Sequence, residues 1–346
     1  WKEIPCNREV LSLRLNLTCG QAFRWRIEDD DITVGVMQHR VWQLKQDETH
    51  IYYRVIACAH WSIASCTSDF RETMEGWCRE PKKFSRKRKL DDINSNQVSF
   101  NQRNCQCHQN EKNILFDYLR LGMDLRAMYS DWCNKDKRFA KVSSALPGIR
   151  MLRQDPSETL FSFICSVNNN ITRIVSMIEK MCNLYGEKLL DYKGTAFYDF
   201  PSLPILASQN TDKDLRELGF GYRAPYIGKC AREVLNNGGE KWLNSLRKKS
   251  YKDAFSALCN FTGVGMKVSD CVCLMSLDKL EAVPVDTHVR QVALRDYKFE
   301  IKTKTLSTKT YQAMGDYFRD LWGLNAGWAQ AVIFVNEIKQ IPQIYE

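Results

Sequence analysis

The sequence predicts an α+β fold, with an antiparallel β-sheet at the N-terminus followed by a mainly helical body. Two observations support this prediction. Short segments of β-type residues, separated by polar turns, fall within about residues 1–66. From Ile114 onward, apolar residues recur at helical spacing instead. Strands gathered at one end of a chain and helices at the other, without an internal repeat, are typical of the α+β class.

Length, charge and cysteine content bound the class of protein. The chain has 346 residues, enough to bury a sizeable core over two or three domains. The net charge of +9 and the pI near 8.8 favour an anionic partner. Fourteen cysteines at irregular spacings, in a chain long enough to fold without disulfides, indicate reduced thiols and a location inside the cell. No apolar run reaches the ~18 residues needed to cross a bilayer, so we expect no membrane partner.

The first predicted strand is Leu11–Leu17, where leucines alternate with polar residues at period two. Gly20 ends this segment. Polar turns separate four further predicted strands, at residues 22–25, 32–37, 41–44 and 51–56. Because neighbouring strands joined by short turns pair antiparallel, we expect one antiparallel sheet over about residues 1–66.

Residues 76–112 are polar and lack any helical or strand period, which predicts a mobile insertion. Six basic residues lie between Lys82 and Lys89. This run is either a solvated linker that attracts DNA non-specifically or a nuclear localisation signal. We expect a nuclear location, with the mitochondrion as the alternative. A short cysteine and histidine cluster at 105–108 lacks a second matched pair of ligands, so we expect no metal site there.

A strong helix start occurs at Asp155, with Pro156 in the first helical position and Glu158 placed to close a capping box. This helix is expected to end at the Asn168–Asn170 run. Further helices are predicted at residues 171–186, around Leu215, and at 242–259, 266–275, 287–296, 310–322 and 327–338. We divide the chain into an N-terminal region, residues 1–150, and a helical region, residues 151–346, that carries a hairpin at 259–267.

The segment from Cys259 to His288 contains the residues best suited to chemistry. Gly263 and Gly265 flank Val264 in a tight turn, where both glycines can take positive φ. A helix that starts after such a turn presents backbone N–H groups to a phosphate. Lys267 lies in the first turn of this helix, and Asp286 follows Pro284 where it can cap the next helix. An amine and a carboxylate brought together form a nucleophile and its charge partner, although each has a plain alternative as a surface charge and an N-cap.

Several short motifs in the sequence resemble those of one known family. They are GVGMK at 263–267, PVD at 284–286, NNN at 168–170, GYRA at 221–224 and GWAQAVIF at 327–334. Together they resemble the helix-hairpin-helix DNA glycosylases, and the 8-oxoguanine DNA glycosylases in particular, from Trp1 almost to the C-terminus except for the insertion. The resemblance implies an enzyme that flips 8-oxoguanine out of duplex DNA opposite cytosine and excises it. Lys267 would attack the sugar and hold it as a Schiff base, with strand cleavage by β-elimination, and Asp286 would stabilise positive charge on the sugar.

The resemblance also implies a base pocket. Gly20 lies within the motif from Leu17 to Trp25. Its carbonyl would accept a hydrogen bond from the N7–H that distinguishes 8-oxoguanine from guanine. Phe334 would stack on the base and Gln330 would read its Watson–Crick edge. Cys271 and Met275 would face the other side of the base. From composition alone, Gly20 is a turn residue and the others are core residues.

A second implied group contacts DNA. Asn168, Arg173, Tyr222 and Arg223 would fill the gap left by the flipped base and read the opposite cytosine. His288 and the backbone of Gly263 and Gly265 would contact phosphates. Without the resemblance, Asn168 is a helix-end residue and the two arginines are surface charges.

The hairpin departs from the family pattern, because Phe261 and Thr262 stand where leucine and proline are usual. We expect the turn to persist and the carbonyls near Cys259, Phe261 and Val264 to be able to hold a monovalent cation. Thr287 replaces an aliphatic residue and can hydrogen-bond Asp286. The last cysteine is Cys273, so the C-terminal iron–sulfur cluster of some related glycosylases is excluded. We expect no required cofactor, no metal, and a monomer that binds double-stranded DNA.

Two other functions remain as alternatives. An alkylated-purine glycosylase would use water as its nucleophile and an electron-rich aromatic pocket for a cationic base. A non-catalytic protein that binds damaged DNA would use the same hairpin. Retention of both Lys267 and Asp286 argues against the second alternative, because a protein that only binds DNA requires neither.

Overall fold

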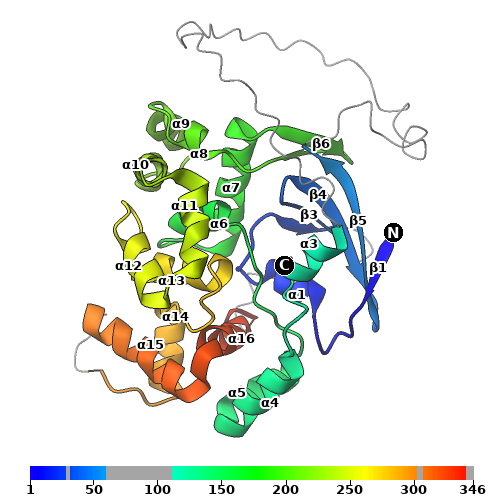
Figure 1. The fold of residues 1–346 in the computed structure, drawn as a ribbon, viewed down its shortest axis with the longest axis vertical. Helices are drawn as coiled ribbons and strands as arrows, with labels where there is room; N and C mark the ends of the chain where they lie inside the picture. Colours follow the sequence, from blue (N-terminus) through cyan, green and yellow to red (C-terminus); the bar gives the residue numbers. More distant parts are fainter. Residues whose placement is uncertain (29–31, 60–110, 302–306, 340–346) are drawn as a thin grey trace, which may run out of the picture.

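The computed structural model describes residues 1–28, 32–59, 111–301 and 307–339. A twisted sheet lies at one side of the molecule and the helices occupy the other, which confirms the predicted α+β class (Figure 1). The sheet is antiparallel and its strands lie in the order β1-β5-β4-β3-β2. Their bounds are β1 Lys2–Pro5, β2 Trp25–Ile27, β3 Thr33–Met37, β4 Arg40–Gln46 and β5 His50–Cys58.

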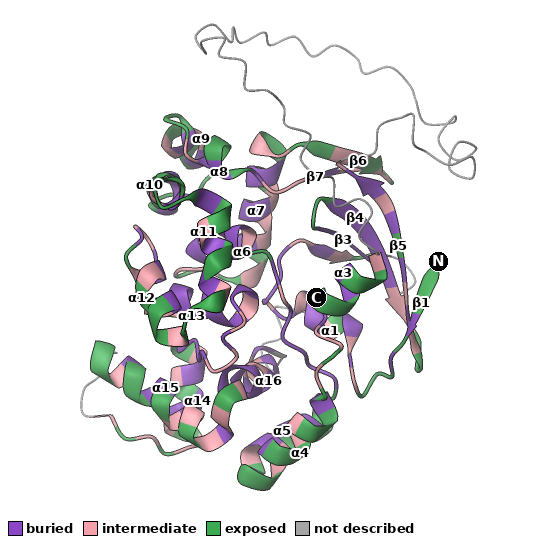
Figure 2. Ribbon diagram, in the orientation of Figure 1, coloured by how far each residue is buried: buried purple, intermediate pink, exposed green. Residues whose placement is uncertain are grey.

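Both faces of the sheet are covered at its centre, where β3 and the first five residues of β4 are buried (Figure 2). Trp42 and Leu44 of β4 pack with residues of α1 (Leu13–Thr18) and α3 (Glu111–Tyr118). On the opposite face, Val34 and Val41 pack against Phe197 of a small hairpin. That hairpin consists of β6 (Lys188–Tyr192) and β7 (Thr195–Tyr198). The side chains of β3 and β4 thus point alternately into two apolar clusters, as expected for strands buried on both faces.

The prediction of a strand at Leu11–Leu17 is wrong, because Leu13–Thr18 forms the helix α1. Leu13 and Leu17 are four residues apart and are both buried on one side of this helix. Asn16 is also buried, and its side chain donates to the carbonyl of Gly148 and accepts from the amide of Arg150. Asn16 is therefore a polar residue whose hydrogen bonds are made inside the protein. Its polarity gave this segment an apparent alternation of apolar and polar residues with a period of two.

The helical body surrounds α13 (Met266–Ser276), which packs against α6 (Pro156–Cys165) and α12 (Tyr251–Cys259). Most of α13 is buried, which fixes the direction in which its first turn points. The remaining helices have these bounds: α4 Leu125–Lys135, α5 Lys137–Ala145, α7 Ile171–Tyr185, α8 Leu203–Leu206, α9 Thr211–Glu217, α10 Arg223–Asn236, α11 Gly239–Ser245, η5 Leu246–Lys248, α14 Thr287–Arg295, α15 Thr308–Trp322, η6 Gly323–Asn325 and α16 Ala326–Lys339.

The predicted start of α6 is confirmed, since the Asp155 side chain accepts from the amide of Glu158 and Pro156 begins the helix. The Glu158 carboxylate contacts Arg24, 3.4 Å from its guanidinium, and so links the helix to the segment before β2. The expected helix at 242–259 is divided at Ser250, whose side chain caps α12. No helix in the described part of the chain is both long and apolar enough to cross a membrane.

Most of the insertion predicted at 76–112 lies outside the described residues, as do its basic run and the cysteine and histidine cluster. Its last two residues are described and belong to α3, which begins at Glu111. The nuclear location therefore stays a prediction.

Candidate active site

A glycine hairpin joins α12 to α13. Gly263 has a φ of +82°, the left-handed conformation that favours glycine, and a Cβ at this position would lie 2.6 Å from the Cβ of Tyr226. Gly265 has a negative φ, so the prediction of positive φ holds for Gly263 alone. In the described part of the chain, no atom beyond the two neighbouring residues lies within 4 Å of the place where a Cβ on Gly265 would be. The first-turn amides of α13 have no acceptor within the helix, so this open backbone offers donors to an anion.

Thr262 stands at the position where proline is usual, and it has its own acceptor. The amide of Thr262 donates to Glu233 at 2.7 Å and its hydroxyl donates to the same carboxylate at 2.6 Å. Glu233 lies on α10, so the hairpin is fixed to a neighbouring helix. The predicted persistence of the turn is confirmed, and these two hydrogen bonds explain how it holds without proline.

Lys267 lies in the first turn of α13 and is half-buried. Its Nζ donates to the Ser166 hydroxyl at 3.2 Å and lies 5.0 Å from the centre of the Phe163 ring. The Ser166 hydroxyl itself donates to the carbonyl of Phe163, so its oxygen is free to accept from the lysine. These contacts hold the amine at the C-terminal end of α6.

Asp286 caps α14 as predicted, with its side chain accepting from the amide of Val289 at 2.9 Å. His288 Nδ1 lies 3.6 Å from the other carboxylate oxygen, which makes an ionic contact rather than a hydrogen bond. Burial alone raises the pKa of Asp286, but His288, the Val289 amide and the charge of Lys267 outweigh it, so the pKa is lowered. The Asp286 carboxylate in turn raises the pKa of His288. No hydrogen bond joins the Thr287 hydroxyl to Asp286 among the described residues.

Lys267 and Asp286 face the same cavity, which has a volume of about 1070 Å³. This volume is ample for a nucleobase together with its sugar. The predicted site residues that line the cavity are Gly20, Asn168, Arg173, Gly263, Gly265, Lys267, Asp286, His288 and Phe334. The fold therefore brings together residues from near the N-terminus, the middle and the C-terminal helix.

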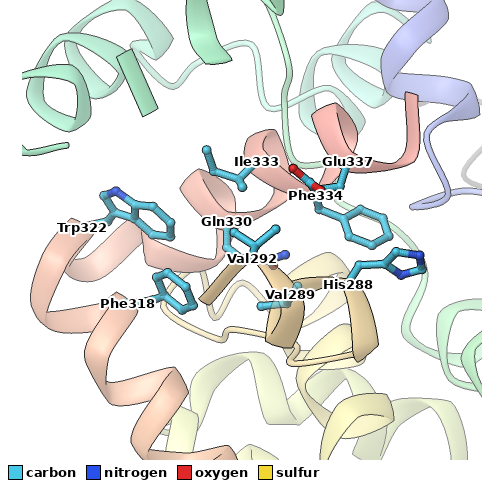
Figure 3. Close-up of a pocket in the computed structure, with 9 residues that line it drawn as sticks. All are labelled: His288, Val289, Val292, Phe318, Trp322, Gln330, Ile333, Phe334 and Glu337. Carbon is cyan, nitrogen blue, oxygen red and sulfur yellow. The ribbon is translucent and has the colours of Figure 1, made fainter. Parts of the chain in front are cut away.

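Gln330 does not line this cavity, although Phe334 on the same helix does. Gln330 is buried and lines a separate space of about 10 Å³ between α14, α15 and α16 (Figure 3). Val289 and Val292 line this small space with Gln330, whereas Phe334 lies beside His288, with their ring centres 5.9 Å apart. Of the two residues of α16 that were predicted to contact the base, only Phe334 therefore lines the cavity.

Cys271 and Met275 lie further along α13, and neither lines the cavity in the described part of the chain. Cys271 is buried, and burial raises the pKa of its thiol to about 11. The amide of Gln154 donates to the carbonyl of Met275 at 2.9 Å. In this structure both residues act as packing residues, and their contact with a base stays a prediction.

The predicted DNA-contact group is organised around Asn168, which has a positive φ of 48° and is exposed. Arg223 is only 3% exposed, so the alternative of a surface charge is wrong for this residue. Its guanidinium donates to the carbonyls of Val167 and Asn168, and the Tyr222 hydroxyl also donates to Val167. Arg173 is exposed in the first turn of α7. Tyr222 and Arg223 therefore fix the loop that presents Asn168 to the cavity.

Two family models match consecutive parts of the chain. Residues 3–160 match the 8-oxoguanine DNA glycosylase N-terminal domain, and residues 161–315 match the HhH-GPD superfamily base excision DNA repair protein. The chain belongs to the 8-oxoguanine DNA glycosylase family. Members of this family therefore supply the comparison for the site described above.

Relatives and solved structures agree with this assignment. An N-glycosylase/DNA lyase of Saccharomyces cerevisiae is 42% identical over 252 residues, which cover 66% of this chain and 66% of the relative. The N-glycosylase/DNA lyase OGG1 of Arabidopsis thaliana is 42% identical over 226 residues, covering 65% and 61%. The matches thus span just under two thirds of these curated relatives.

A structure of the Clostridium acetobutylicum 8-oxoguanine glycosylase/lyase, in complex with double-stranded DNA containing cytosine opposite 8-oxoguanine, has a TM-score of 0.71 against this chain. The two are 25% identical, and the match covers 96% of this chain and 93% of the other.

Several cavity residues were not predicted from the sequence, and three of them contact or adjoin the catalytic pair. Phe163 and Ser166 contact Lys267, and Tyr311 lines the cavity beside Asp286. The first two lie at the end of a predicted helix directly before the Asn168–Asn170 run, which was a usable signal. Tyr311 lies in a helix without a recognisable motif, so the sequence of this family member offered no signal for it.

No cluster of histidine, cysteine, aspartate or glutamate residues able to hold a metal ion occurs in the described ranges. The carbonyl of Phe261 accepts from the amide of Val264 within the hairpin. Binding of a monovalent cation by the hairpin carbonyls stays a prediction.

Proposed function

We propose that the protein is a bifunctional N-glycosylase/AP lyase that excises 8-oxoguanine opposite cytosine from duplex DNA. One observation carries this proposal. Lys267 and Asp286 line a single cavity beside the glycine hairpin, and they are close enough for the charge of Lys267 to lower the pKa of Asp286. An amine and an ionised carboxylate at the edge of a cavity of nucleotide size suit covalent attack on a sugar.

The reaction proceeds through a covalent intermediate. The Lys267 amine bonds to C1′ of the deoxyribose as the C1′–N9 bond breaks, and the base leaves with the electrons of that bond and takes up a proton. The amine gives up a proton, and opening of the sugar ring yields a Schiff base between Nζ and C1′. Removal of a proton from C2′ then breaks the C3′–O bond and cleaves the strand. Water as the nucleophile would not produce this second step.

Asp286 stabilises the positive charge that develops on the sugar as the glycosidic bond lengthens. Its lowered pKa keeps it ionised at neutral pH. Its fixed hydrogen bond from the Val289 amide limits reorganisation during the reaction. The chemistry therefore depends on a charge that is in place before DNA binds.

DNA binds along the rim of the cavity. The open backbone at Gly265 and the imidazole of His288 contact phosphates, and Arg173 and Asn168 approach the strand opposite the lesion. The base enters beside Phe334, and Gln330 reads its edge once the Gln330 amide turns from its small pocket toward the cavity. The carbonyl of Gly20 provides the acceptor that favours 8-oxoguanine over guanine.

Single-turnover assays with duplexes that carry one 8-oxoguanine opposite each of the four bases test this function. With borohydride present, the cytosine duplex is expected to give the fastest excision and a covalent protein–DNA complex, and Lys267→Gln is expected to abolish both. Base release without a covalent complex would favour an alkylated-purine type enzyme that uses water. Binding without any release would favour a non-catalytic DNA-damage-binding protein.

A further inference from the structure

A buried carboxylate lies on the same helix as Lys267, one turn further along. Asp270 is only 1% exposed, and it accepts hydrogen bonds from two tyrosine hydroxyls. Tyr251 donates to Oδ1 at 2.7 Å, and Tyr311 donates to Oδ2 at 2.5 Å. The mechanism proposed above uses none of these three residues.

The two tyrosines differ in their other contacts. The Tyr311 hydroxyl also accepts from the amide of Val285 at 3.3 Å, and Val285 directly precedes Asp286. Tyr311 is buried and lines the catalytic cavity. The ring of Tyr251 lies instead against Arg319 and Phe255. Arg319 donates to the carbonyl of Glu281, five residues before Asp286, so Tyr251 contacts that loop only through Arg319.

Two hydrogen bonds therefore run from the lysine helix to the carboxylate loop. The first joins Tyr311 to Asp270, three residues after Lys267, and the second joins the Val285 amide to Tyr311. Between the end of α13 and the start of α14 the chain follows a loop rather than a regular element. Other hydrogen bonds hold the first part of this loop, where the carbonyls of Leu280 and Glu281 accept from Gly327 and Arg319. Tyr311 instead bonds the residue next to Asp286.

We propose that Tyr311 is a positioning residue, which sets the distance between Asp286 and Lys267 by connecting the Val285 amide to Asp270. This inference rests on the proposed function for its catalytic consequence, but the connection itself can be measured separately. Reacting groups must be held within a fraction of an ångström, and a misplacement of about 1 Å is able to slow a reaction by about a hundredfold.

A matched pair of variants separates positioning from general stability. Tyr311→Phe and Tyr251→Phe each remove one hydroxyl donor from the same carboxylate, and each leaves the ring in place. Only Tyr311→Phe also leaves the Val285 amide without its acceptor. If the network only stabilises the fold, the two variants should have similar excision rates. If Tyr311 positions Asp286, the excision rate of Tyr311→Phe should be the lower of the two.

The first test measures single-turnover excision at saturating duplex, together with the DNA concentration that gives half-saturation, below the thermal midpoint of each variant. Tyr311→Phe is expected to lower the rate about tenfold or more and to change half-saturation less than about twofold. Tyr251→Phe is expected to retain the rate within about twofold at a comparable loss of thermal midpoint. Equal rates in the two variants would overturn the proposal.

The second test does not require activity. The pKa of His288 depends on how close Asp286 lies, and Glu337 and Lys267 are the other charges that act on it. An NMR titration of the His288 ring is expected to show a lower pKa in Tyr311→Phe and an unchanged pKa in Tyr251→Phe. If the wild type excised nothing, the proposed function would fail. This titration would still show whether Tyr311 controls the position of Asp286. An unchanged His288 pKa in Tyr311→Phe would contradict it.

Discussion

At the residue scale, the ionic contact between Asp286 and His288 makes the site pH-dependent. The folded-state pKa of Asp286 is lowered, so its contribution to stability is present above its ordinary value and is lost as pH falls through the folded value. The folded-state pKa of His288 is raised, so its contribution is full below about 6.5 and is lost as pH rises through the folded value. Both charges coexist between these two folded-state values.

Replacing Asp286 by Asn is expected to lower the pKa of His288 toward about 6.5, because the carboxylate that raises it is removed. NMR titration of the imidazole measures this shift. The same variant is expected to excise 8-oxoguanine much more slowly while binding duplex DNA nearly as well as the wild type. An unchanged excision rate would remove Asp286 from its proposed role.

Replacing His288 by Gln is expected to weaken binding to duplex DNA most at low pH, where the imidazole is charged. The wild type should lose affinity as pH rises from about 6 to 8.5, and the variant should show a flatter profile. Loss of one phosphate contact should also reduce the slope of log affinity against log salt by about 1. Binding measured by fluorescence anisotropy over pH and salt checks both. Parallel pH profiles would mean that His288 does not contact DNA.

The sequence predicted the chemistry-bearing residues better than their surroundings. Lys267 and Asp286 were recognisable because they lie in short sequence motifs next to turn residues. The burial of Arg223 was not predictable, because the carbonyls that hold it belong to Val167 and Asn168 in a distant part of the chain. Gln330 was predicted to read the base because of the family resemblance, and its spacing from Phe334 does not specify which neighbouring helix covers its side of α16.

At the element scale, the hairpin depends on an interaction that replaces the usual proline. Glu233→Ala leaves the amide and hydroxyl of Thr262 without their acceptor. We expect a loss of about 1–3 kcal/mol in the free energy of unfolding and a several-fold weaker affinity for duplex DNA. Chemical denaturation and anisotropy measure these effects.

A second substitution provides the control for this prediction. Thr262→Pro in the Glu233→Ala background removes both donors, so it is expected to restore most of the DNA affinity. If Glu233→Ala alone binds DNA like the wild type, the carboxylate has no role in ordering the hairpin.

Other elements show where sequence patterns fail. The starts of α13 and α14 were predicted to the residue, because a glycine or an aspartate cap precedes each. The hairpin of β6 and β7 was missed inside a region assigned to helices. Its turn at Lys193 and Gly194 has two consecutive positive φ values, so this dipeptide was the available signal.

At the scale of the whole molecule, ion pairs join residues of the sheet region to more distant parts of the chain. Arg24 contacts Glu158 of α6, and His39 lies 2.5 Å from Asp199. Burial raises the pKa of Glu158 to about 7. A carboxyl group whose folded-state pKa is raised opposes folding once it ionises, so its effect on stability becomes less favourable as pH rises from its unfolded value to about 7.

Glu158→Gln removes this ionisation. The difference in free energy of unfolding between the variant and the wild type is therefore expected to move in favour of the variant as pH rises from about 4.5 to 7. Because 23% of the Glu158 side chain stays exposed, solvent screening reduces the size of the effect. Urea denaturation at several pH values measures it. A difference that stays constant with pH would show that Glu158 is ionised throughout.

The α+β architecture was predictable because strand and helix periods are segregated along the chain. The cavity was not, since it forms only when Gly20, the loop at Asn168 and the C-terminal helix meet around α13. Short motifs identified which residues to compare, and the tertiary structure determined which of them share one space.

Peptide mass spectrometry of the complex trapped by borohydride on an 8-oxoguanine:cytosine duplex tests directly whether Lys267 is the nucleophile. A reduced deoxyribose adduct is expected on Lys267, with no adduct when Asp286 and Lys267 are both replaced. An adduct on a different lysine, or free 8-oxoguanine without any adduct, would contradict it.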